Sequence, residues 1–124
     1  MVKYVSKESL QTARNNVPRE DVVTREGVFP CAGMTTLELQ QYRLAVGDLK
    51  NKDYIPAMIM VLGCKDSEGR RLFKEEDQLW LCEIGADISE LVVNTILKLS
   101  GIGLDAEEEI LKNLKAEPDV QESE

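Results

Sequence analysis

The segment Tyr54-Ile-Pro-Ala-Met-Ile-Met-Val-Leu62 is the most informative part of the sequence about the fold, because it is apolar on every side of a helix. Asp53 offers an N-cap just before it, and Pro56 fits the first turn of a helix. A helix that is apolar all round is central in a core or lies at an oligomer interface. The sequence therefore predicts a central helix over 54–62, with the other elements packed around it.

A capping box opens the helix that precedes this central segment. Thr35 is the expected N-cap, and Glu38 stands three residues later. Apolar residues recur at helical spacing from there to about Leu49, so we expect one stripe of this helix in the core. Ser6 is the expected cap of a shorter helix near the N-terminus, predicted over 6–15.

Further helices are predicted after the central segment. Three acids at 75–77 favour a helix start, because the helix macrodipole attracts negative charge at its N-terminus. Asp87 and Glu90 have the spacing of a second capping box. They precede the strongest amphipathic stripe in the chain, which ends at Gly101. A third box begins the last predicted helix, over 105–115.

A different pattern separates the first two helices. Val22 and Val23, then Val28 and Phe29, flank a short turn at Gly27, which predicts a β-hairpin. The expected fold class is therefore mainly α: a small bundle of five or six short helices with a short N-terminal β-hairpin.

Length and charge indicate one domain with a tail. The chain has 124 residues, enough for a single domain, which we place over 1–115. The formal net charge is −8, but the last twenty residues alone hold eight acids and two bases. Residues 116–124 are polar and without periodicity, so they are expected to form a disordered acidic tail.

Composition excludes several classes of function. The acidic balance argues against nucleic-acid binding, which needs basic groups to neutralise phosphates. The longest apolar run, 55–62, is too short to span a bilayer, and the N-terminus lacks the apolar region of a signal peptide. Cys31, Cys64 and Cys82 are widely spaced and odd in number, so each is expected to be a small buried hydrophobe in a reducing cytoplasm.

Candidate chemistry is weak throughout the sequence. The loop from Cys64 to Glu75 can be aligned with a calcium-binding EF-hand loop, but Cys64 supplies no oxygen at the first ligand position, so a turn between helices is expected instead. The chain has no histidine, which leaves a cysteine nucleophile without its usual base. We therefore expect no enzyme, no metal and no cofactor.

Apolar surface is the remaining functional signal. The segments 54–62, 79–84 and 88–99 carry more hydrophobic faces than a small domain easily buries, although packing of all of them inside one protomer stays an alternative. Met is pliable toward apolar partners and Trp is enriched at interface centres. The predicted partner-binding residues are Tyr54, Met58, Met60, Trp80 and Leu97.

The order of four motifs adds a resemblance. They are Pro18-Arg-Glu-Asp-Val22 before the hairpin, Met34-Thr-Thr-Leu-Glu38 at a helix start, Asp66-Ser-Glu-Gly-Arg-Arg-Leu-Phe73 in the polar turn, and Leu99-Ser-Gly101 at a helix stop. In this order, over residues 6–115, the chain resembles the tail assembly chaperone family of long-tailed, siphovirus-type bacteriophages.

The resemblance implies a non-enzymatic assembly factor in the host bacterial cytoplasm, absent from the mature virion. Such a protein binds the long, helix-rich tape measure protein and keeps it soluble until the tail tube polymerises around it. Implied partners are the tape measure protein, the tail tube protein, a frameshift-extended form of the chain and further copies of itself, with no nucleic acid and no membrane. The alternative is a small acidic adaptor, or a nucleic-acid mimic, that binds a basic host protein.

Overall fold

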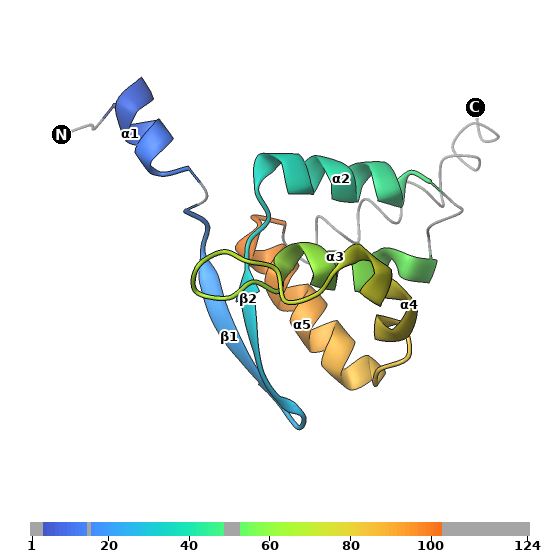
Figure 1. Cartoon of the computed structure of the whole chain (residues 1–124). Helices are drawn as coiled ribbons and strands as arrows, with labels where there is room; N and C mark the ends of the chain where they lie inside the picture. Colours follow the sequence, from blue (N-terminus) through green and yellow to red (C-terminus); the bar gives the residue numbers. More distant parts are fainter. Residues whose placement is uncertain (1–3, 15, 49–52, 103–124) are drawn as a thin grey trace, which may run out of the picture.

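The computed structural model describes residues 4–14, 16–48 and 53–102, and it is mainly helical with one N-terminal hairpin (Figure 1). This confirms the fold class expected from the sequence. In chain order the elements are α1 (Lys7–Thr12), β1 (Arg19–Thr24), β2 (Gly27–Ala32), α2 (Thr36–Val46), α3 (Ile55–Gly63), the 3₁₀ helix η2 (Glu75–Asp77), α4 (Gln78–Leu81) and α5 (Ala86–Leu99). The helix predicted over 105–115 and the tail predicted over 116–124 lie outside the described residues.

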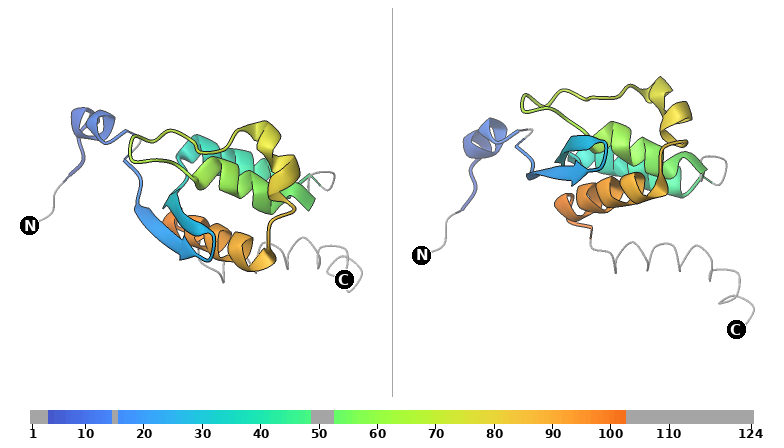
Figure 2. Two further views of the ribbon diagram at one scale, coloured as in Figure 1. Left: turned by 60° about the horizontal axis from the view of Figure 1, so that its bottom comes forward. Right: turned by 90° about the horizontal axis from the view of Figure 1, so that it is seen from below.

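Helix α3 is the centre of the core, as its composition predicts. It packs against α2 on one side and α5 on the other, with η2 and α4 beside it (Figure 2). Gly63 lets α3 and α5 approach closely, because a Cβ atom at this position would collide with the side chain of Ile96. The all-round apolar surface of α3 is therefore largely covered by its neighbours.

The hairpin covers α5. β1 and β2 are antiparallel, with Val22 opposite Phe29 and Val23 opposite Val28. Val22 is buried, whereas Val23 and Val28 are exposed, as expected for side chains that alternate between the two faces of a sheet. Both strands contact α5, so the inner face of the hairpin closes one side of the core.

Cap geometry confirms some sequence signals and corrects others. The Thr35 and Glu38 box is present, with Thr35 N donating to Glu38 Oε1 at 3.0 Å. The predicted Asp53 cap of α3 is wrong, since Tyr54 is the N-cap residue and makes no side-chain cap bond. The predicted box at Asp87 is also wrong: Gly85 is the N-cap of α5, and the Asp87 carboxylate binds Arg25 of the hairpin turn.

The end of α5 follows its sequence signal. Gly101 has φ +84, a conformation that favours glycine, and Ile102 N donates to Leu97 O at 2.9 Å. Ser100 Oγ accepts a hydrogen bond from Met34 N at 2.8 Å, which ties this helix end to the segment just before α2.

Two of the three cysteines are buried as expected. Cys31 and Cys64 are fully buried and lie opposite each other in an isolated β-bridge. Cys82 is exposed, so the expectation of burial is wrong for this residue. It follows the last residue of the short helix α4, on the outside of the core.

Helix α1 stands away from the rest of the molecule (Figure 1). Ser6 is its N-cap, as predicted, and accepts a hydrogen bond from Ser9 N at 3.1 Å. None of the residues of α1 is buried.

Candidate functional site

A cleft with a mixed apolar and polar lining lies where α2, α3, η2 and α4 meet. Its volume is about 360 Å³. Four of the lining side chains are mainly apolar, namely Leu44, Ala45, Tyr54 and Met58, and the other four, which we call the rim, are polar, namely Gln41, Asp48, Glu75 and Gln78. A concave apolar surface with a polar rim is typical of sites that bind an apolar partner.

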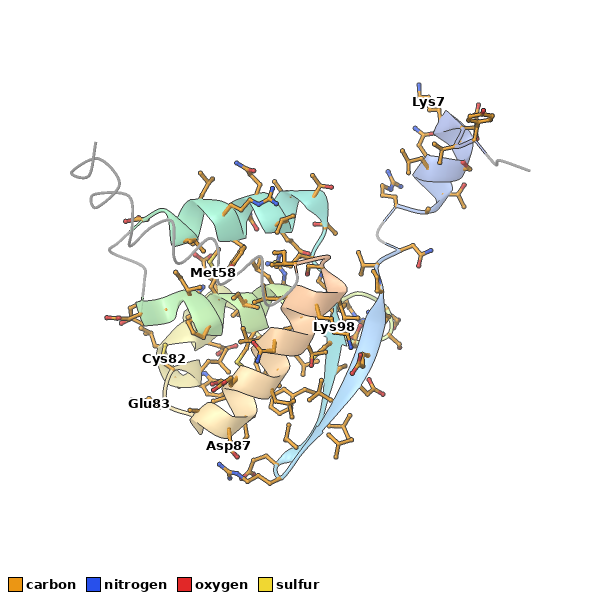
Figure 3. All side chains as sticks on the ribbon, turned by 180° about the vertical axis from the view of Figure 1, so that it is seen from behind. Lys7, Met58, Cys82, Glu83, Asp87 and Lys98 are labelled. Atoms are coloured by element: carbon orange, nitrogen blue, oxygen red, sulfur yellow. The ribbon has the colours of Figure 1, made fainter. Side chains whose placement is uncertain are left out.

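Helical periodicity brings the apolar lining together. Tyr54 and Met58 are four residues apart at the start of α3 and therefore share one side of that helix. Figure 3 shows Met58 between α2 and α3. Leu44 faces outward from α2 and is 65% exposed, while the next residue, Ala45, is buried. The lining of the cleft thus includes both a buried residue, Ala45, and an exposed one, Leu44.

Trp80 of α4, the helix that contributes Gln78 to the cleft, is held on the surface by two contacts. Its ring packs edge-on against Phe73, with centroids 5.9 Å apart, and its Nε1 donates to Asp77 Oδ1 at 2.9 Å. Hydrogen bonds from the backbone N–H of Lys74 and from the Trp80 indole lower the pKa of Asp77. The indole is therefore fixed in position while 46% of the residue stays exposed, and Leu79 next to it is 68% exposed.

The structure separates the five predicted partner-binding residues. Tyr54 and Met58 line the cleft, and Trp80 lies on α4, which contributes Gln78 to it. Met60 and Leu97 are core residues, 0% and 1% exposed, so the prediction that they form contact surface is corrected. Met60 follows Met58 by two residues, about 200° around the helix, which turns it into the core.

Sequence reasoning missed Leu44 as a site residue. The apolar stripe of α2 includes Tyr42, Ala45 and Val46, all buried, and Leu44 lies off that stripe. An apolar residue outside the buried stripe of an amphipathic helix was the available signal. Leu79 is also exposed. It belongs to the apolar segment 79–84, but it is not among the five predicted partner-binding residues.

The loop after α3 is a turn, as expected, and the carboxylate of Asp66 stabilises that turn. Asp66 Oδ1 accepts hydrogen bonds from Glu68 N and Arg70 N, both at 2.9 Å, and Gly69 has φ +84. The backbone bond from Arg70 is the main cause that lowers the pKa of Asp66. Within the described ranges, no cluster of three or more His, Cys, Asp or Glu side chains is arranged to hold a metal ion.

A second, polar pocket of about 300 Å³ lies at the start of α2. Its buried acid, Glu38, accepts from Lys65 Nζ at 2.6 Å and from Arg71 at 2.7 Å. Burial raises the pKa of Glu38, but the bonds from Lys65, Arg71 and Thr35 outweigh burial and lower it overall. Because the buried carboxylate is paired with both cations, the cluster is explained by its role in the fold, and the cleft between α2 and α3 remains the candidate site.

The fold and the cleft together define a small helical domain with one candidate binding cleft between α2 and α3. No helix within the described part of the chain is long and apolar enough to cross a membrane. No protein-family model matches the chain, and no curated protein matches its sequence.

The fold is that of a solved phage protein, the bacteriophage HK97 tail assembly chaperone. The two structures align with a TM-score of 0.55 over 76% of this chain and 98% of that chain, at 14% sequence identity. At this identity the likeness concerns the fold, so the residues of the cleft have to be argued from their own geometry.

Proposed function

We propose that this protein is a bacteriophage tail assembly chaperone that binds the tape measure protein. In the host cytoplasm it keeps that long protein soluble until tail tube subunits polymerise around it, and it is absent from the mature virion. The observation that carries the proposal is the fold shared with the HK97 tail assembly chaperone. The order of motifs along residues 6–115 supports the same family.

The cleft suits an amphipathic helix of the client. Helix-in-groove recognition places apolar side chains, spaced three, four or seven residues apart, into a hydrophobic groove. Leu44 and Tyr54 border such a groove, and the pliable side chain of Met58 lies within it. Trp80 and Leu79 extend the apolar surface along α4. A tape measure protein rich in helices offers many segments of this kind.

The rim of the cleft adds a preference for charge. Asp48 and Glu75 are both acidic, so a client helix with Lys or Arg beside its apolar stripe is favoured. Exposed charges act mainly on the rate of encounter and are screened by salt, whereas apolar contacts are not. We therefore expect binding that is moderately faster at low salt and persists at high salt.

Co-expression with the tape measure protein encoded by the same phage tests the proposal. Leu44→Asp and Trp80→Asp each place a charge in the proposed contact, and both should lower the yield of soluble co-purified client at least tenfold. Leu91→Asp on α5 is the matched control, because Leu91 is similarly exposed, at 47%, and lies outside the cleft. Circular dichroism checks that all three variants keep their helicity.

Two outcomes would contradict the proposal. Client solubility that does not depend on this chain removes the chaperone function. Binding that survives both cleft variants but is lost at 0.5 M salt, or after removal of residues 116–124, points instead to the acidic adaptor.

A further inference from the structure

The N-terminal segment forms an arm that its own body leaves uncovered. α1 buries none of its residues, and Figures 1 and 3 show it projecting from the hairpin end of the molecule, with Lys7 directed away from the body. Its exposed apolar residues are Tyr4, Val5 and Leu10, at 84%, 77% and 63%. Val5 and Leu10 occupy the N′ and N4 positions, the two positions that a hydrophobic staple uses, so both lie at the same end of α1.

The arm also differs from the rest of the chain in charge. Residues 1–14 contain Lys3, Lys7 and Arg14 against the single acid Glu8, a net charge of +2 in a chain of −8. Lys7 and Leu10 are three residues apart and share one side of α1. The arm therefore presents an apolar anchor next to a cation.

The cleft between α2 and α3 has the complementary character. Its lining includes Leu44, Ala45 and Met58, and the charged side chains among its described lining, Asp48 and Glu75, are both acids. Its volume of about 360 Å³ is enough to admit a leucine side chain with part of a second apolar residue. Leu44 at the edge supplies exposed apolar surface on which a short helix can lie.

We propose that α1 of one copy docks in the α2–α3 cleft of a second copy. Leu10 and Val5 are the apolar anchors, and Lys7 lies toward the acidic rim formed by Asp48 and Glu75. Donor and acceptor are different surfaces of the same chain, so the contact is heterologous and copies join head to tail. The inference concerns contacts between copies of this chain and stands independently of the proposed client.

Two complementary variants test this arrangement. Leu10→Asp disables the arm, and Leu44→Asp disables the cleft. Both residues are more than half exposed, so neither substitution removes core packing. Sedimentation velocity over a hundredfold range of protein concentration should show that the unchanged (wild-type) chain forms oligomers, and that their size increases with concentration. Each variant alone should remain monomeric, while Leu91→Asp should behave as the unchanged chain.

The mixture of the two variants gives the sharpest result. Leu10→Asp keeps an intact cleft, and Leu44→Asp keeps an intact arm. A 1:1 mixture should therefore form heterodimers and nothing larger. A charge swap is the second measurement: Lys7→Glu and Glu75→Lys should each weaken association at least threefold, and the double variant should recover it.

Several results would overturn the inference. An unchanged chain that is monomeric at every concentration excludes the contact. Oligomers that persist in Leu10→Asp place the interface elsewhere. A mixture that stays monomeric excludes the head-to-tail contact. Association of Leu44→Asp with itself indicates symmetric pairing of two arms, and a monomer that expands on Leu10→Asp indicates an arm folded onto its own body.

Discussion

Lys65 Nζ lies 2.6 Å from Glu38 Oε1, and both side chains are withdrawn from water. Glu38 stands in the first turn of α2, while Lys65 follows the end of α3, so the ion pair joins two segments 27 residues apart. Arg71 binds the second carboxylate oxygen at 2.7 Å, and Thr35 N binds the first. One carboxylate thus caps a helix and anchors the loop after α3.

Removing this carboxylate charge should destabilise the domain strongly. Glu38→Gln keeps an acceptor for Thr35 but leaves the buried ammonium of Lys65 without a counter-charge, which costs about 3 kcal/mol in the free energy of unfolding. Urea denaturation measures the loss. Glu68→Gln, which breaks an exposed pair with Arg70, is the control and should change stability by about 0.5 kcal/mol or less. Equal effects of the two substitutions would refute a special role for Glu38.

The same pair predicts a dependence on pH. The folded-state pKa of Glu38 is lowered from its ordinary value of 4.5, so its contribution is fully present above that pH and is lost as the pH falls through the folded-state pKa. The stability difference between the unchanged chain and Glu38→Gln should therefore shrink as the pH is lowered below 4.5. Urea titrations at a series of pH values from 7 down to 3 provide the comparison, and a difference constant over this range would count against the assignment.

Close packing of α3 on α5 makes Gly63 intolerant of a side chain. Gly63→Ala forces the added methyl group into the side chain of Ile96 and should cost about 1–3 kcal/mol. Gly47→Ala is the matched control, because Gly47 has a helical φ of −76 and its nearest neighbours would lie at ordinary contact distances of 3.6 and 3.7 Å. Thermal unfolding separates the two variants, and an unchanged melting temperature for Gly63→Ala would show that the helices can move apart.

Thiol reactivity should distinguish Cys82 from the other cysteines. Cys82 is exposed, and partial burial with the nearby acids Glu83 and Asp53 raises its pKa. One thiol per chain should react with an alkylating reagent in the native state, more slowly than a free thiol at neutral pH, because less thiolate is present. Mass spectrometry should find three modified thiols after denaturation. Native labelling of Cys31 or Cys64 would be inconsistent with their burial.

Arm and client should compete for one cleft if both proposals are correct. Deleting residues 1–14 removes the neighbour's arm, so a client helix should bind the shortened chain more tightly than the full chain, at least threefold at high protein concentration. At low concentration, where copies are separate, the two affinities should converge. Fluorescence anisotropy of a labelled client peptide measures both. Equal affinities at high concentration would mean that the two ligands use different surfaces.

Local sequence signals predicted those features that depend on neighbouring residues. The Thr35 and Glu38 box, the turn at Gly27 and the stop at Gly101 are each set within a few residues, and each is present. Signals that distant groups could override were less reliable. Asp87 is spaced to cap α5, but Arg25, 62 residues away, binds its carboxylate instead.

The apolar run after Tyr54 was sufficient to predict a helix at the centre of the fold, because such a helix has no polar face to turn toward water. Which of its residues line the cleft depends on the packing of the neighbouring helices and could not be predicted from the run itself. Met58 and Met60 are the same residue type with the same helix propensity, yet Met60 is buried in the core while Met58 lines the cleft. Exposure depends on how neighbouring helices are arranged, and a helix that is apolar on all sides does not encode that arrangement in its own periodicity.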